Sequence, residues 1–206
     1  MEEKYFSAHE EEKIINKYLD KDPNKEIGIY IDIGASLPIE NNNTYYYYLR
    51  NWIGLSIDPH PAYFKVQKEI RPRDIFESIA ITNYDGEIDM VATAVDKSIH
   101  GKYLRELYSN DLKNACYKVK CLTLNSLIKK YPKFIEPDIL SIDIETHEDK
   151  ALSVTDFSLF KPKIILIEYL INGFDYRTIW EKYIHPYYIF KETIGANALY
   201  IRRTGR

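Results

Sequence analysis

Four acidic residues each stand at or near the end of a short apolar run of the sequence. They are Asp32, Asp58, Asp143 and Glu168. Such runs are typical of buried parallel strands, and the carboxyl ends of parallel strands meet at one edge of a sheet, where ligands bind. A single acid after a strand is more often a turn or capping residue. Four acids in phase favour a ligand site.

The turn Asp32-Ile-Gly-Ala-Ser36 closes the first of these runs and limits which cofactors fit. Its single glycine, Gly34, lets the backbone pass close to a ligand because no Cβ intervenes. The dinucleotide fingerprint needs three glycines, and Leu37 and Pro38 stand where further glycines would be required. Since the phosphate-binding loop G-x-x-x-x-G-K-[ST] is also missing, the sequence disfavours NAD, FAD and ATP.

Asp58 ends the second run, where an acid in this topology accepts hydrogen bonds from two ribose hydroxyls. A ribose-binding acid beside a turn unsuited to pyrophosphate indicates an adenosine without phosphates. S-adenosylmethionine is such a ligand, and its sulfonium cation is compatible with several nearby carboxylates.

The rest of the chain alternates elements that would position these residues. Strands are expected at 27–33, 53–57, 75–81, 88–94, 139–143 and 163–168, and helices at 44–51, 60–70, 124–131, 147–152 and 176–184. Residues 101–112 read as helical or irregular, and 187–192 pairs with 197–203 in an antiparallel hairpin around Gly195. The alternation predicts an α/β fold with an open, mostly parallel sheet covered by helices on both faces.

Composition and charge limit the number of domains, the partners and the location to be expected of this protein. The 206 residues predict a single domain, with an N-terminal covering helix within 1–22 and a core over 27–203. A balance of 28 Lys+Arg against 31 Asp+Glu argues against nucleic acid as the main partner. No segment approaches the roughly 18 consecutive apolar residues of a membrane helix. The two cysteines, Cys116 and Cys121, are too few for a disulfide framework, so we expect a cytoplasmic protein.

Five segments have a characteristic order and spacing. They are Tyr30-Ile-Asp-Ile-Gly-Ala-Ser36, Asn42-Asn-Thr-Tyr45, Trp52-Ile-Gly-Leu-Ser-Ile-Asp-Pro-His-Pro61, Val119-Lys-Cys-Leu-Thr-Leu-Asn-Ser-Leu127 and Asp138-Ile-Leu-Ser-Ile-Asp-Ile-Glu-Thr-His-Glu148. Together they resemble the FkbM family of S-adenosylmethionine-dependent methyltransferases, over about residues 27–168.

The resemblance implies a Rossmann-like class I methyltransferase fold, with a seven-stranded sheet whose last strand is antiparallel. It also implies O-methylation, often of sugar hydroxyls in glycans or natural products. The cofactor residues it implies are Asp32, Gly34, Ala35 and Ser36 at the methionine part, Asn43 and Thr44 at its carboxylate, Asp58 at the ribose, Ala80 at the adenine, and Asp143 beside them. One residue departs from the family pattern: Thr146 stands where glycine is usual, and its Cβ could crowd the acceptor.

Methyl transfer from a sulfonium is an in-line displacement, so the protein mainly aligns the reacting atoms while a general base helps remove the hydroxyl proton. Candidates for the base are Asp143, Glu145, His147 and Glu168. The ordinary pKa of histidine favours His147, although a capping role at a helix start suits it equally well. Asp143 and Glu168 offer oxygen ligands for a divalent metal, but a metal-free site is the favoured interpretation.

The aromatic residues are expected to have two different roles. Most of Tyr45 to Tyr48 are expected in the core, whereas Tyr169, Phe174 and Tyr176 could bind the apolar face of a sugar. The sequence therefore predicts an S-adenosylmethionine-dependent O-methyltransferase with a small-molecule or glycan acceptor. Two alternatives are a non-catalytic nucleoside-binding or scaffold protein with the same fold, and a methyltransferase acting on a lipid, peptide or small metabolite.

Overall fold

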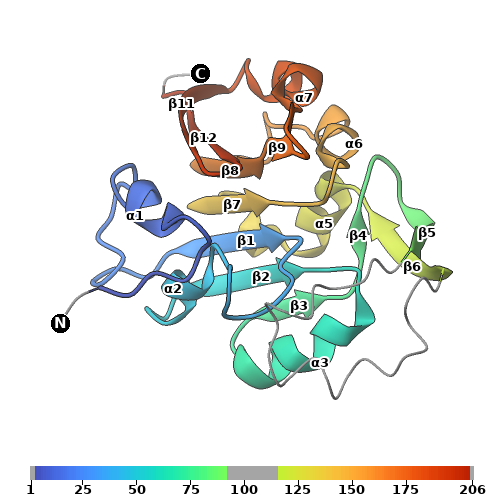
Figure 1. The fold of residues 1–206 in the computed structure, drawn as a ribbon, viewed down its shortest axis with the longest axis horizontal. Coiled ribbons are helices and arrows are strands. Elements are labelled where there is room, and N and C mark those ends of the chain that lie inside the picture. The colour runs from blue at the N-terminus through green and yellow to red at the C-terminus, as the bar shows by residue number, and fades with distance from the viewer. Residues whose placement is uncertain (1–2, 92–115, 205–206) are drawn as a thin grey trace.

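The large sheet of the molecule has the strand order β11-β12-β8-β7-β1-β2-β3 in the computed structural model, which describes residues 3–91 and 116–204 (Figure 1). Its strands are β1 (Ile29–Ile33), β2 (Ile53–Ile57), β3 (Ile75–Glu77), β7 (Ile139–Ile142), β8 (Ile164–Glu168), β11 (Tyr188–Ile194) and β12 (Asn197–Arg202). β12 is antiparallel to both of its neighbours, and the pairs formed by β1, β2, β3, β7 and β8 are parallel. The predicted fold class is confirmed.

Strand residues alternate between two apolar layers because both faces of the sheet are covered. Ile31, Leu140 and Ile165 pack with residues of α5 (Leu124–Lys130), α6 (Glu148–Ser153) and α7 (Arg177–Ile184). The neighbouring residues Tyr30 and Ile139 pack on the opposite face, with α1 (Glu11–Ile15) and α2 (Tyr45–Tyr48). This two-sided burial explains the unbroken apolar runs of the sequence.

The chain reverses direction across the sheet at β1. It moves outward from β1 through β2, α3 (Pro61–Ile70) and β3, and it later returns to pair β7 with the other side of β1. Such a switch point leaves a crevice outside the carboxyl ends of the strands. The loops after β1, β2 and β7 therefore meet at one edge.

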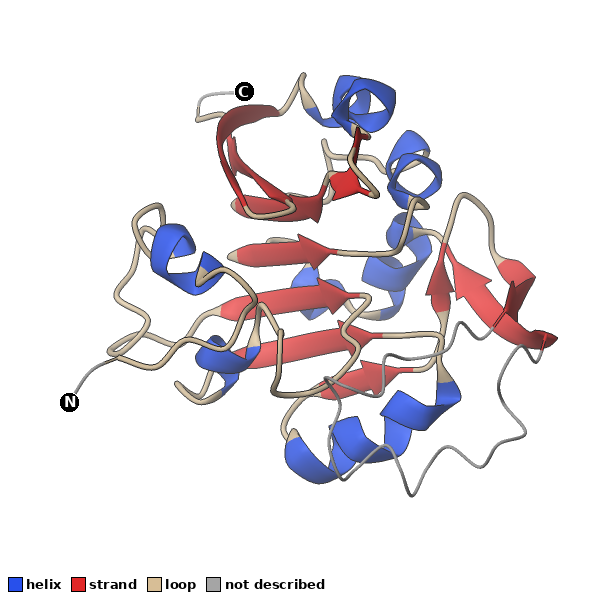
Figure 2. Cartoon of the chain, viewed as in Figure 1, coloured by secondary structure: helices blue, strands red, loops and turns tan. Residues whose placement is uncertain are grey.

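A second, three-stranded sheet lies beyond the carboxyl ends of the large sheet (Figure 2). It consists of β4 (Ala80–Ile81), β6 (Cys116–Leu122) and β5 (Gly86–Val91). The single strand predicted at 75–81 is wrong, because β3 stays in the large sheet while β4 pairs with β6. The predicted strand at 88–94 matches β5 in part, and residues 92–94 and the uncertain stretch 101–112 lie outside the described residues.

The N-terminal helix is much shorter than predicted. Only Glu11–Ile15 is α-helical, and the Glu12 carboxylate instead accepts hydrogen bonds from the backbone N–H groups of Phe6 and Ser7. This carboxylate, which is buried, stabilises a turn ahead of α1 that a continuous helix would not allow. The helical spacing of apolar residues indicated correctly that one face of this segment packs on the sheet, as Ile15 does. It did not indicate the length of the helix.

Three short elements finish the fold: η2 (Pro132–Phe134), β9 (Leu170–Ile171) and β10 (Phe174–Asp175). The last two form a small hairpin directly after β8, with Asn172 and Gly173 at its turn, both with left-handed backbone. Among the helices of the described segments, none has the length and apolar character needed to cross a membrane.

Candidate functional site

A cavity of about 430 Å³ opens at the carboxyl ends of β1, β2 and β7. Its lining includes ten of the residues expected at a cofactor or catalytic site: Asp32, Gly34, Ala35, Ser36, Asn43, Asp58, Ala80, Asp143, Glu145 and His147. Cavities of this size commonly hold small ligands and cofactors. The structure therefore brings together residues that are up to 115 positions apart in the chain.

Gly34 allows the closest approach of backbone at this edge. Its φ angle is +80°, and a Cβ built there would lie 1.6 Å from the Asp143 carbonyl oxygen. The N–H groups of Gly34 and Ala35 both donate to the Ile57 carbonyl oxygen, at 2.9 and 3.0 Å. The turn after β1 is thus fixed between the ends of β2 and β7, and only glycine fits at position 34.

The Asp58 carboxylate is fixed by two backbone donors. Its Oδ2 accepts from the Ser36 N–H at 3.0 Å, and its Oδ1 accepts from the His60 N–H at 2.8 Å. Burial raises the pKa of Asp58 to about 6, even though both hydrogen bonds oppose that rise. Each oxygen retains a second lone pair for a ligand hydroxyl.

Asp32 is held through Oδ2, which accepts from the Thr44 Oγ1 hydroxyl at 2.7 Å and from the Asn42 amide at 3.3 Å. Burial raises the pKa of Asp32, whereas the positive charge of Arg71 and these hydrogen bonds lower it. Thr44 itself is fully buried and does not line the cavity. Asn43 does line it, and its side-chain amide donates to the Ser141 hydroxyl at 3.1 Å.

Asp143 and Glu168 form a carboxyl pair. They follow Ile142 and Ile167, which are register partners in β7 and β8. Burial raises the pKa of both groups, and the Asp143 charge raises the pKa of Glu168 further. Glu168 Oε2 is buried and has no hydrogen-bond partner among the described residues. The charge of Asp143 disfavours ionisation of Glu168, so the pair retains a proton to higher pH than an isolated carboxyl does, and Asp143 lines the cavity.

The loop between β7 and α6 contains three exposed residues, Glu145, Thr146 and His147, of which Glu145 and His147 line the cavity. Glu145 and Thr146 have left-handed backbone, with φ angles of 55° and 78°. Glycine adopts this conformation without strain, which explains in physical terms the glycine expected at position 146. His147 precedes the first residue of α6, and its side chain makes no capping hydrogen bond.

Several residues that contribute to the site gave little signal in the sequence. Asn42 lines the cavity and donates to the carbonyl oxygens of Ala35 and Leu37, both at 3.0 Å. Arg71 is buried beneath Asn42, and Ile88 and Met90 of β5 also line the cavity. Asn42 belongs to a polar run that marks a ligand loop, whereas an arginine after a helix reads as a surface residue.

The cavity suits an adenosine-containing cation. Its lining joins the apolar side chains of Ile79, Ala80 and Ile81 to a wall that contains Asp32 and Asp58. S-adenosylmethionine would place adenine against the apolar part and its positive charge beside the acids. In the parts of the chain that the structure describes, no three His, Cys, Asp or Glu side chains converge in a way that could hold a metal ion.

The strand order, the antiparallel β12 and the acidic edge define a Rossmann-like class I methyltransferase domain. The family model for the FkbM methyltransferase domain matches residues 32–185. The chain belongs to the FkbM family of S-adenosylmethionine-dependent methyltransferases.

Two solved structures match this chain to different extents. Methyltransferase FkbM from Methylobacillus flagellatus KT superposes with a TM-score of 0.53 and 11% identity, over 91% of this chain and 50% of that enzyme. This chain thus spans half the length of that enzyme. A TehB-like SAM-dependent methyltransferase from Corynebacterium glutamicum ATCC 13032 Kitasato gives a TM-score of 0.44 and 10% identity, over 85% and 80% of the two chains. No curated protein matches the sequence.

The left-handed backbone at Thr146 generates a stability prediction. The substitution Thr146→Gly should raise the free energy of unfolding by roughly 0.5–1 kcal/mol, because relief of about 1–2 kcal/mol of backbone strain exceeds the entropy lost by glycine. Urea denaturation monitored by circular dichroism measures the change. Lys150→Gly in α6 is the control and should lower stability by about 1 kcal/mol. A less stable Thr146→Gly variant would contradict the strain at this position.

Proposed function

We propose that this chain transfers the methyl group of S-adenosylmethionine to a hydroxyl oxygen, with a sugar of a glycan or natural product as the acceptor. The observation that supports O-methylation best is the pair of carboxyls Asp143 and Glu168 at the cavity. An ionised carboxylate with a raised pKa is a stronger base than an ordinary one, and a hydroxyl acceptor needs such a base near neutral pH.

The cofactor, when bound, supplies an activated methyl group on a sulfonium. In our proposal Asp58 binds the ribose hydroxyls, Ala80 and its neighbours contact the adenine, and Asp32, Gly34, Ala35, Ser36 and Asn43 surround the methionine part. Thr44 acts on that part through Asp32, to which it is hydrogen-bonded. Much of the catalytic effect would come from alignment of the acceptor oxygen with the methyl group.

Asp143 is the base we favour, with Glu168 as the proton-bearing partner that keeps it in place. Asp143 lines the cavity and Glu168 lies beside it without lining it. Glu145 and His147 also line the cavity and remain rivals for this role. Both are exposed, so water competes with the acceptor for them.

The β9–β10 hairpin is the acceptor surface that we propose. It follows Glu168 directly and exposes the ring of Phe174, which is 55% exposed and packs edge-on against Tyr176 at 4.8 Å. The Arg177 guanidinium lies 4.4 Å above the Tyr169 ring and pairs with Asp175. Aromatic faces beside a planar ion pair suit the apolar and hydroxyl faces of a sugar.

Cys121, a buried free thiol, is compatible with the reducing cytoplasm that we propose as the location.

The cofactor assignment predicts opposite effects of Asp58→Asn on binding and on stability. Calorimetric titration with S-adenosylhomocysteine should show at least tenfold weaker binding, because the amide cannot accept hydrogen bonds from both ribose hydroxyls. Because the pKa of Asp58 is raised from 3.8 to about 6, its ionisation destabilises the folded state increasingly between pH 4 and pH 6. The variant should therefore be about 1–2 kcal/mol more stable than wild type at pH 8 and no more stable at pH 4.

Asp156→Asn, at an exposed turn outside the cavity, is the control for ligand binding and should leave it unchanged. Absence of S-adenosylhomocysteine binding by the folded wild type would overturn the methyltransferase proposal in favour of a scaffold protein.

The base assignment predicts a contrast between two isosteric substitutions. Asp143→Asn should reduce kcat at least 100-fold because it removes the base. Glu168→Gln should retain at least a third of the activity, because its amide N–H can still donate to Asp143. The wild-type rate should rise with pH as Asp143 ionises. Methyl transfer from radiolabelled cofactor to a panel of methyl glycosides and polysaccharides measures these rates, and a larger loss with His147→Asn than with Asp143→Asn would move the base to His147.

The acceptor surface predicts a change in KM alone. Phe174→Ala and Tyr176→Ala should each raise KM for a sugar acceptor at least threefold while kcat and S-adenosylhomocysteine affinity stay within twofold. Phe64→Ala serves as a matched control, since Phe64 is a comparably exposed ring on α3. Unchanged acceptor KM in both hairpin variants would contradict this surface, and methylation of a lipid, peptide or small metabolite in place of any sugar would replace the substrate class.

A further inference from the structure

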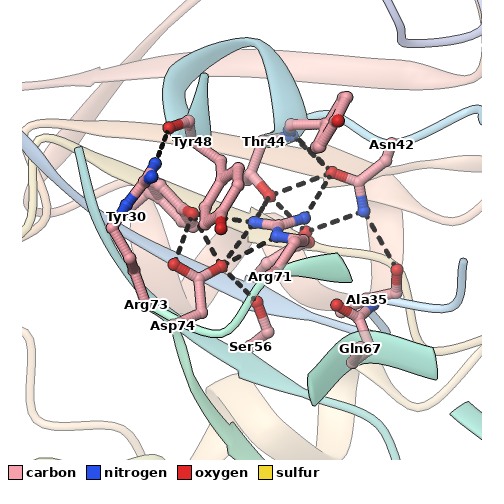
Figure 3. A network of polar contacts seen from close by, with 12 residues as sticks. Tyr30, Ala35, Asn42, Thr44, Tyr48, Ser56, Gln67, Arg71, Arg73 and Asp74 are labelled. Atoms are coloured by element: carbon pink, nitrogen blue, oxygen red, sulfur yellow. Dashed lines mark hydrogen bonds and ion pairs between the residues drawn. The ribbon is translucent and has the colours of Figure 1, made fainter. Parts of the chain in front are cut away.

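Arg71 is a buried cation that contacts the cavity-lining residue Asn42, and Figure 3 shows its network of polar contacts. It follows α3 and is 1% exposed, and it is the only buried Lys or Arg side chain in residues 3–91 and 116–204. Its Nε donates to Asp74 Oδ2 at 2.8 Å, and its Nη2 donates to the Tyr30 hydroxyl at 2.8 Å. Removal of a guanidinium from water costs free energy unless other groups compensate its charge and accept its hydrogen bonds. The groups that surround Arg71 therefore indicate what the buried charge does.

Two hydrogen-bonded paths lead from Arg71 to one atom of the cavity wall. Nη2 donates to Thr44 Oγ1 at 2.9 Å, and the Thr44 hydroxyl donates to Asp32 Oδ2. Nη1 donates to Asn42 Oδ1 at 3.0 Å, and the Asn42 amide donates to the same Asp32 oxygen. Both paths contain a single intermediate side chain, and together they hold Oδ2 from two directions.

The network also fixes the loop that carries these intermediates. Asn42 Oδ1 accepts from the backbone N–H groups of Thr44 and Tyr45, at 2.9 and 2.8 Å, while its amide holds the carbonyl oxygens of Ala35 and Leu37. The guanidinium can only donate, so together with these two N–H groups it favours the orientation in which the Asn42 amide N–H faces Asp32. Arg71 thereby contributes to the orientation of both donors that Asp32 Oδ2 receives.

Charge neutralisation alone does not explain this design. Asp74 already pairs with Arg71 through both Nε and Nη2, so that pair is electrically complete without Thr44 or Asn42. The two further contacts connect Arg71 to the hydrogen-bond partners of Asp32, and the positive charge of Arg71 opposes the burial that raises the pKa of Asp32.

We propose that Arg71 is a positioning residue for the cofactor: through Asn42 and Thr44 it orients Asp32 and preserves its negative charge for the ammonium group of the methionine part of S-adenosylmethionine. This inference rests on the proposed function. The proposed role of Arg71 concerns only the methionine half of the ligand site. The ribose acid Asp58 is fixed by backbone N–H groups and not by Arg71.

Two probes that differ in the methionine part test the inference by calorimetric titration at pH 7.5. S-adenosylhomocysteine has the amino-acid part, and methylthioadenosine lacks it. Arg71→Gln combined with Asp74→Asn keeps the net charge of the pair and should raise the Kd of S-adenosylhomocysteine at least tenfold. The Kd of methylthioadenosine should stay within twofold. Thr44→Val, which breaks one path with little change of shape, should act in the same direction by at least threefold.

Arg73→Gln is the matched control. Arg73 also lies after α3, but it donates to the Tyr48 carbonyl oxygen and stacks on the Tyr48 ring at 4.0 Å, with no path to Asp32. It should leave both Kd values unchanged. Circular dichroism establishes folding of each variant, and Thr44→Val decides the question if the Arg71 double variant is unfolded.

Equal weakening of both probes would reduce Arg71 to a general structural role and overturn the inference, as would unchanged binding of both probes by folded variants. Wild-type binding of methylthioadenosine without S-adenosylhomocysteine would also overturn it, because no methionine site would then exist. Binding of neither probe by wild type would instead defeat the proposed function itself.

Discussion

The burial of carboxylates at one edge of the sheet is the physical constraint on which this molecule depends. Desolvation disfavours the charged form of every acid at this edge, and each acid is stabilised in a different way. Asp58 uses two backbone N–H groups, and Asp32 uses the buried cation Arg71 through two polar side chains. Asp143 lies beside Glu168, and its charge raises the pKa of Glu168, so that this pair retains a proton to higher pH than an isolated acid. The loops after β1, β2 and β7 have the conformations that deliver these partners.

Close backbone packing makes this arrangement possible. Gly34 lies against the Asp143 carbonyl oxygen, so the first and fourth parallel strands of the chain end within contact of each other. A side chain at position 34 would separate β1 from β7 and move Asp32 away from Asp143. Shortly after Asp143 the chain turns sharply through Glu145 and Thr146, both in left-handed conformation, before α6 begins. Local backbone strain thus accompanies the region proposed for chemistry.

The strand ends were the most predictable part of the site. Apolar runs and topology alone place Asp32, Asp58, Asp143 and Glu168 at one edge. The turn after the first run also singles out Gly34, and the family likeness adds Ala80. Networks of side chains were not predictable in this way. Arg71 and Asn42 are separated by 29 positions and meet only because α3 returns beneath the turn after β1. The short α1 was missed for a related reason, since hydrogen bonds from Phe6 and Ser7 to Glu12 override helix periodicity.

The different means of stabilisation assign different chemistry to acids of the same kind. A carboxylate near a fixed buried cation has its charged form favoured by that cation, and it suits a permanent contact with a cationic ligand group. A carboxylate held by backbone N–H groups retains acceptor capacity, as contacts to neutral hydroxyls require. A carboxyl pair that shares a proton can change its protonation during a reaction, because the raised pKa brings proton uptake close to neutral pH. These three tasks fit, in turn, Asp32, Asp58 and the Asp143–Glu168 pair. A bound cation beside these acids would offset part of the electrostatic repulsion between their buried charges.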